Sequence, residues 1–162
     1  MTWKQLTPSI YHRIAFGSAY GLTDVGLVRQ SNEDNFLIDP SLRLVAVADG
    51  MGGHDGGEIA ACLALQTLRE ALAASVPKKA SPGDAADPDA TWQDEHMPAI
   101  VAVHEAVDAA NARVYGANVQ KGHGEGSGMG TTLTGFWQSL PGGPLVIFHV
   151  GDSRLYRYRN GE

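Results

Sequence analysis

The order of apolar and polar side chains divides this chain into short strands, two helices and polar connections. Short runs in which apolar residues alternate with small or polar ones are typical of half-buried strands. Turn-forming residues separate these runs, as at Pro40–Ser41 and Asn160–Gly161. The predicted strands cover residues 18–24, 34–39, 42–49, 131–137, 144–150 and 153–159.

Two stretches carry apolar residues at the spacing of an amphipathic helix. The first follows the glycine-rich turn 50–57, where Asp55 and Glu58 have the spacing of a capping box. The second begins near Pro98, because proline is favourable in the first turn of a helix. Between them, the proline-containing stretch 75–97 predicts an exposed connection. The predicted buried stripe of the first helix is Ala61, Leu65, Leu68 and Leu72. That of the second helix is Val103, Val107, Ala110 and Val114.

The elements follow the order strands, two helices, strands. Regular alternation of strand and helix would indicate a parallel, doubly wound sheet, whereas this order is typical of an antiparallel α+β domain. A chain of 162 residues is long enough for one domain with a buried core. We therefore predict a layered antiparallel α+β fold.

Composition narrows the range of functions. The formal net charge is -6 at pH 7, and nucleic-acid binding needs clustered basic side chains, so we expect no nucleic-acid partner. The single Cys62 cannot form an internal disulfide, which favours a reducing compartment, and its Ala- and Leu-rich surroundings predict burial. Residues 1–16 lack the apolar core of a signal peptide, and no apolar run reaches the length of a membrane span. We expect a cytoplasmic protein.

Carboxylates lie where predicted strands begin or end. Asp34 precedes one apolar run, and Asp49 and Asp152 follow two others. A carboxylate at a strand end is costly to desolvate unless a cation pairs with it, and a divalent ion is a suitable partner. Gly50 has no side chain, so its carbonyl could approach an ion closely, and Glu33 could hold metal-bound water. The pattern indicates a candidate metal site.

Two further side chains would suit phosphate chemistry. Arg29 offers a bidentate fork for a phosphate group, and His54 could donate a proton to a leaving oxygen. Taken alone, each motif has a simpler interpretation. Asp49–Gly50 would be a plain turn, residues 32–34 an Asx turn, residues 151–154 a hairpin connection, and His54 a solvated loop histidine.

The motifs together resemble, in their order along the chain, the metal-dependent protein phosphatases of the protein phosphatase 2C family in its bacterial form. The resemblance covers nearly the whole chain from about residue 20 onward. We take residues 17–162 as the motif-bearing region. It rests on residues 24–29 with 32–34, on 47–54, on 128–132 and on 150–156.

The resemblance implies a sandwich of two antiparallel sheets flanked by helices, and a site with two Mg²⁺ or Mn²⁺ ions. Asp49 would bridge the ions, Arg29 would bind phosphate, and His54 would be the general acid. Asp152 would be associated with a third ion, and the 128–132 turn would have a structural role. The implied metal ligands are Glu33, Asp34, Asp49, Gly50 and Asp152.

The implied activity is hydrolysis of phosphoserine and phosphothreonine in proteins by a water that bridges two divalent metals. Implied partners are phosphoprotein substrates and a cognate serine/threonine kinase, with a monomeric complete protein. Family members continue beyond the position of Glu162 with further metal-binding aspartates. We therefore expect residues 1–162 to be the N-terminal part of a single phosphatase domain, inactive alone. The alternative is a pseudophosphatase fragment that binds phosphoproteins without hydrolysing them.

Overall fold

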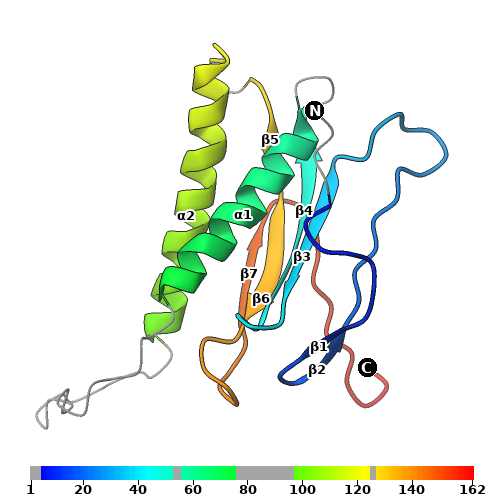
Figure 1. The fold of residues 1–162 in the computed structure, drawn as a ribbon, viewed down its shortest axis with the longest axis vertical. Helices are drawn as coiled ribbons and strands as arrows, with labels where there is room; N and C mark the ends of the chain where they lie inside the picture. The colour runs from blue at the N-terminus through cyan, green and yellow to red at the C-terminus, as the bar shows by residue number, and fades with distance from the viewer. Residues whose placement is uncertain (1–4, 53–55, 76–96, 125–126) are drawn as a thin grey trace, which may run out of the picture.

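The structure of the chain, a computed structural model, describes residues 5–52, 56–75, 97–124 and 127–162. It contains short antiparallel strands and two long helices, which confirms the predicted antiparallel α+β class (Figure 1). In chain order the elements are β1 (His12–Ile14), β2 (Gly17–Ala19), β3 (Asp34–Asp39), β4 (Leu44–Met51), α1 (Gly57–Ser75), α2 (Met97–Gln120), β5 (Gly130–Thr131), β6 (Leu133–Trp137) and β7 (Val146–Val150).

The main sheet is antiparallel throughout, in the order β3-β4-β6-β7, with β5 paired to the end of β4. β1 and β2 form a separate hairpin. In the pairing of β3 with β4, Asp34 lies opposite Asp49, and Asp39 lies opposite Leu44. The register therefore brings two of the predicted metal ligands together at one end of the sheet.

Both helices cover the same face of the sheet (Figure 1). Side chains alternate between the faces of a strand, so Leu44, Ala46 and Ala48 of β4 all enter one apolar cluster with the helices. All four residues of the predicted stripe in α1 are buried, and the stripe in α2 is buried except for the partly buried Val107. Both helix predictions are confirmed, although Asp55 and residues 76–96 lie outside the described residues.

Cys62 is 1% exposed on α1, as predicted, and burial raises the pKa of its thiol. No helix within the described ranges is long and apolar enough to span a bilayer.

The described residues cover the opposite face of the sheet only in part. Phe36 and Ile38 of β3 pack with Ile14 of the β1–β2 hairpin. Farther from the hairpin, Val47 is 42% exposed and Ile147 is 58% exposed. The chain thus builds one complete helix-covered layer and leaves apolar side chains accessible on the other side of the sheet.

Asp39 fixes the turn between β3 and β4. Its carboxylate accepts hydrogen bonds from the backbone N–H and the hydroxyl of Ser41 and from the backbone N–H of Leu42. It also pairs with Arg69 of α1, with Nε 2.6 Å from Oδ2. Burial alone would raise the pKa of Asp39, but these hydrogen bonds and the Arg69 charge outweigh it and lower the pKa.

Several strand boundaries differ from the prediction. Residues 153–159 form no strand, because no described segment pairs with them in a ladder. Of residues 18–24, only the first two belong to a strand, since β2 pairs with a partner of three residues. The predicted strand 131–137 is interrupted at Thr132, and β4 continues past Asp49 to Met51.

Candidate metal centre

The centre of the site is the carboxylate pair Asp34 and Asp49, which are direct partners on β3 and β4. Partial burial, a hydrogen bond between the two side chains and the negative charge of Asp49 together raise the pKa of Asp34 above its ordinary value of 3.8. Thr23 and the charge of Arg29 act in the opposite direction. Adjacent carboxylates repel each other unless a proton or a cation lies between them, so the pair is suited to a cation.

Two threonines hold the backbone of Asp49. The Asp49 N–H donates to the Thr132 hydroxyl over 3.0 Å, and the Thr132 N–H donates to the Asp49 carbonyl over 2.9 Å. The Thr131 hydroxyl donates to the same carbonyl over 3.0 Å. Asp49 therefore lies inside a strand that is bonded on both sides, and the plain-turn interpretation of Asp49–Gly50 is wrong. These contacts depend on long-range pairing, so no local sequence pattern predicts them.

Gly50 lies where three backbone segments meet. Its N–H donates to the Glu33 carbonyl over 3.2 Å, and a Cβ at Gly50 would overlap the Gly57 carbonyl. A Cβ at Gly57 would in turn overlap the Glu33 carboxylate. The Glu33 side chain thus lies against the first residue of α1, where the helix dipole favours negative charge. This contact gives Glu33 a structural role, in addition to the metal-site role predicted from its sequence context.

The loop before β3 is shaped by side chain to backbone hydrogen bonds. The Asp34 N–H donates to Asn32 Oδ1 over 3.0 Å, which is the Asx turn considered for residues 32–34. The Asn32 amide donates to the Thr23 hydroxyl over 2.7 Å. The Asx turn and the carboxylate pair are therefore compatible, since the turn positions Asp34 at the start of the strand.

The two carboxylates line a hollow of about 220 Å³. Ser153 also lines it, and its hydroxyl lies 2.6 Å from that of Thr132. Asp152, the neighbour of Ser153, is exposed just after β7. Since residues 153–159 form no strand, the hairpin interpretation of 151–154 is wrong, and Ser153 of this segment instead lines the hollow.

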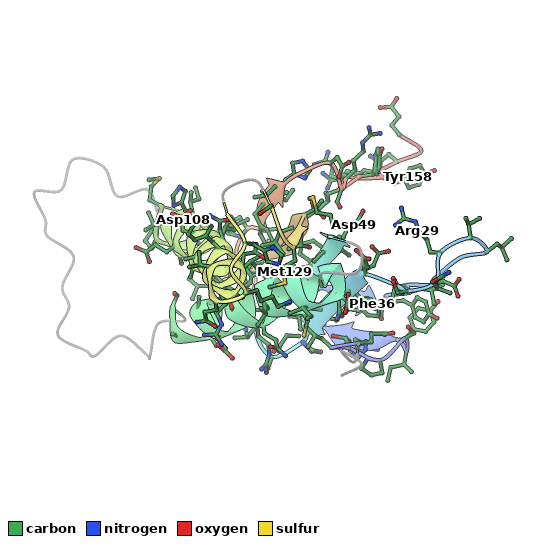
Figure 2. The ribbon with its side chains drawn as sticks, turned by 90° about the horizontal axis from the view of Figure 1, so that it is seen from above. Arg29, Phe36, Asp49, Asp108, Met129 and Tyr158 are labelled. Carbon is green, nitrogen blue, oxygen red and sulfur yellow. The ribbon has the colours of Figure 1, made fainter. Side chains whose placement is uncertain are left out.

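Arg29 is exposed, and Figure 2 shows it near the end of β4 that carries Asp49. His54 lies outside the described residues. Within the described ranges, no three His, Cys, Asp or Glu side chains gather as a ready-made metal cluster. The two carboxylates and the Gly50 carbonyl are hard oxygen donors of the kind that Mg²⁺ and Mn²⁺ prefer, so they fit part of a ligand set.

A family model described as "Protein phosphatase 2C" matches residues 27–162. The serine/threonine protein phosphatase PstP of Mycobacterium tuberculosis is 36% identical over 140 residues, which cover 86% of this chain and 22% of that protein. The serine/threonine phosphatase stp of Listeria monocytogenes is 30% identical over 141 residues, which cover 85% of this chain and 48% of that protein. The chain therefore spans less than half the length of either relative.

Two solved structures are similar to the chain. The PPM Ser-Thr phosphatase MsPP of Mycobacterium smegmatis, in complex with cacodylate, has a TM-score of 0.60 and 36% identity over 87% of this chain and 48% of its own. The catalytic domain of PstP in complex with two manganese ions has a TM-score of 0.59 and 34% identity over 85% of this chain and 49% of its own.

Proposed function

The chain belongs to the protein phosphatase 2C family, and from this membership we propose that it contributes to metal-dependent hydrolysis of phosphoserine and phosphothreonine in proteins. We further propose that residues 1–162 form the N-terminal part of one phosphatase domain, since they span about half the length of the solved relatives. The observation that carries the proposal is the cross-strand pair of Asp34 and Asp49.

The residues around this pair would hold divalent ions, Mg²⁺ or Mn²⁺. Asp49 and the Gly50 carbonyl would bind them directly, and Asp34 with Glu33 would order their water ligands. Asp152 would bind a third ion. When bound, the ions would supply a water of lowered pKa and would offset negative charge on the phosphoryl oxygens. The manganese ions in the PstP structure support this choice of metal by similarity.

Two basic groups would act on the substrate. Arg29 would bind two phosphate oxygens through its planar guanidinium group, and it is close enough to influence the charge state of Asp34. His54 would donate a proton to the leaving serine or threonine oxygen. The substrates would be phosphoproteins, and a serine/threonine kinase would supply them.

A non-catalytic role is the second candidate. Within the described ranges, no third His, Cys, Asp or Glu side chain joins Asp34 and Asp49 in a metal cluster, and Mg²⁺ or Mn²⁺ takes about six ligands. A chain with an incomplete ligand set could still bind a phosphoprotein through Arg29. This candidate predicts phosphopeptide binding without release of phosphate.

The experiment measures Mn²⁺ binding by calorimetry and phosphate release from a phosphothreonine peptide. It compares the chain with Asp49→Asn and with the control Asp108→Asn, which removes an exposed carboxylate on α2 that pairs with His104. We expect Asp49→Asn to weaken Mn²⁺ binding at least about tenfold and the control to leave it unchanged. Phosphate release is measured on the complete phosphatase domain, because residues 1–162 are expected to be inactive alone. Release that a chelator abolishes supports the enzyme, and peptide binding by the complete domain without release supports the second candidate. Unchanged Mn²⁺ binding by Asp49→Asn would reject the metal site.

A further inference from the structure

Asn118, near the end of α2, makes two hydrogen bonds to one backbone residue. Its side-chain nitrogen donates to the Met129 carbonyl over 2.7 Å, and its Oδ1 accepts from the Met129 N–H over 3.0 Å. An amide that donates and accepts in this way takes the place of a neighbouring β-strand. A side-chain amide supplies both the donor and the acceptor from one planar group.

The surroundings of Met129 leave little room for another arrangement. Met129 is 3% exposed and packs between the helices with Ala64 and Val114. Gly128 has φ of 98°, and a Cβ there would lie 2.5 Å from the Asn118 oxygen. The clamp, defined as Asn118 with Gly128 and Met129, therefore fixes the position where the chain enters β5.

The residues directly after the clamp hold the metal-site aspartate. Thr131 and Thr132 make the three hydrogen bonds to the Asp49 backbone described above. A continuous series of short contacts thus leads from α2 through the clamp to Asp49.

We propose that Asn118 is a positioning residue for Asp49, acting through Met129 and the two threonines. The inference rests on the proposed metal site. Metal ligands need support from the groups around them, and removal of such a group typically weakens metal binding by about 10- to 100-fold. Because Asn118 acts at a distance, its removal should weaken Mn²⁺ binding by an amount near the lower end of this range.

The test uses two variants of Asn118 that differ in the bonds they retain. Asn118→Leu has a similar size and loses both hydrogen bonds to Met129. Asn118→Asp keeps the acceptor for the Met129 N–H and loses the donor, so it should be intermediate. The matched control is Asn111→Leu, at an exposed position on the same helix.

Two readouts are needed besides thermal unfolding. The first is the Mn²⁺ dissociation constant, measured well below the melting temperature, which should rise about tenfold in Asn118→Leu, less in Asn118→Asp and not in the control. The second is hydrogen exchange of the Asp49 amide in metal-free protein, which should accelerate about tenfold in Asn118→Leu while the amides of β3 keep their rates.

The outcomes separate the two proposals. If Asp49→Asn weakens Mn²⁺ binding but Asn118→Leu and Asn118→Asp bind Mn²⁺ and exchange the Asp49 amide as the unmodified chain does, the positioning role is wrong and the metal site stands. If both Asn118 variants only lower the melting temperature, Asn118 is merely structural. If the unmodified chain binds no Mn²⁺, the metal site is rejected, and the positioning role is rejected with it.

Discussion

Replacement of Asp34 by Asn should have opposite effects on stability with and without metal. Without metal, the substitution removes one of two adjacent negative charges. Partial burial, the hydrogen bond with Asp49 and the charge of Asp49 raise the pKa of Asp34, so the charged form is unfavourable there. Asp34 and Asp49 are both exposed, so solvent screens the interaction, and the gain in free energy of unfolding should be about 0.2–1 kcal/mol. For a chain of this size, that gain raises the melting temperature by about 0.4–4 °C.

Saturating Mn²⁺ should reverse the order of the two melting temperatures, so that the unmodified chain melts above Asp34→Asn. A ligand at 100 times its dissociation constant stabilises the folded protein by about 2.7 kcal/mol, which corresponds to a rise of about 5–11 °C. If Asp34→Asn weakens Mn²⁺ binding tenfold, the same concentration stabilises the variant by only about 1.4 kcal/mol. The variant should therefore melt above the unmodified chain in a chelator and below it in Mn²⁺.

The assay is thermal unfolding of both proteins at neutral pH, in a chelator and in Mn²⁺, with Asp108→Asn as the charge-matched control. The difference in the chelator should also disappear as the pH falls below the raised pKa of Asp34, because the protonated side chain no longer repels Asp49. Equal rises of melting temperature in Mn²⁺ for Asp34→Asn and the unmodified chain would refute the assignment of Asp34 to the metal site.

Four further substitutions test the fold and the site. Asp39→Asn should lower the free energy of unfolding in urea by about 1–3 kcal/mol at pH 7; because the folded pKa lies below 3.8, the loss should shrink as the pH falls through that pKa. Gly50→Ala should cost at least about 1–3 kcal/mol, measured in the same way, because its Cβ overlaps backbone atoms. Leu68→Ala, at a position with 0% exposure, should cost about 2–5 kcal/mol. Arg29→Ala should raise KM for a phosphopeptide more than it lowers kcat in steady-state assays of protein that turns over, since it removes mainly binding.

Each of these predictions has a control or a contrary result. For Gly50→Ala the control is Gly116→Ala, where the added Cβ meets no atom within 4 Å and should be tolerated. A cost for Asp39→Asn that stays constant down to pH 2 would mean that the carboxylate charge is not what stabilises the turn. A Leu68→Ala chain as stable as the original would show that the helices do not depend on this core. A fall in kcat with unchanged KM would show that Arg29 acts in the chemical step and not in substrate binding.

The sequence by itself determined the two helices and the strands β3 and β4. The apolar stripes of α1 and α2 repeat at helical spacing within one segment, so burial of one face follows from local order alone. The strand predicted over 34–39 matches β3 because an apolar run between a polar loop and a turn is also a local signal. The acidic residues at strand ends could likewise be recognised without a structure.

Tertiary structure decided which of these residues meet. The pairing of Asp34 with Asp49 depends on the β3–β4 register, in which a shift of one residue would turn every side chain to the other face. The break at Thr132 in the strand predicted over 131–137 depends on contacts between residues far apart in the chain, and so does the clamp at Asn118. Residues 153–159 alternate like a strand yet form none, because a strand exists only where a neighbour accepts its hydrogen bonds, and no local pattern can supply that neighbour.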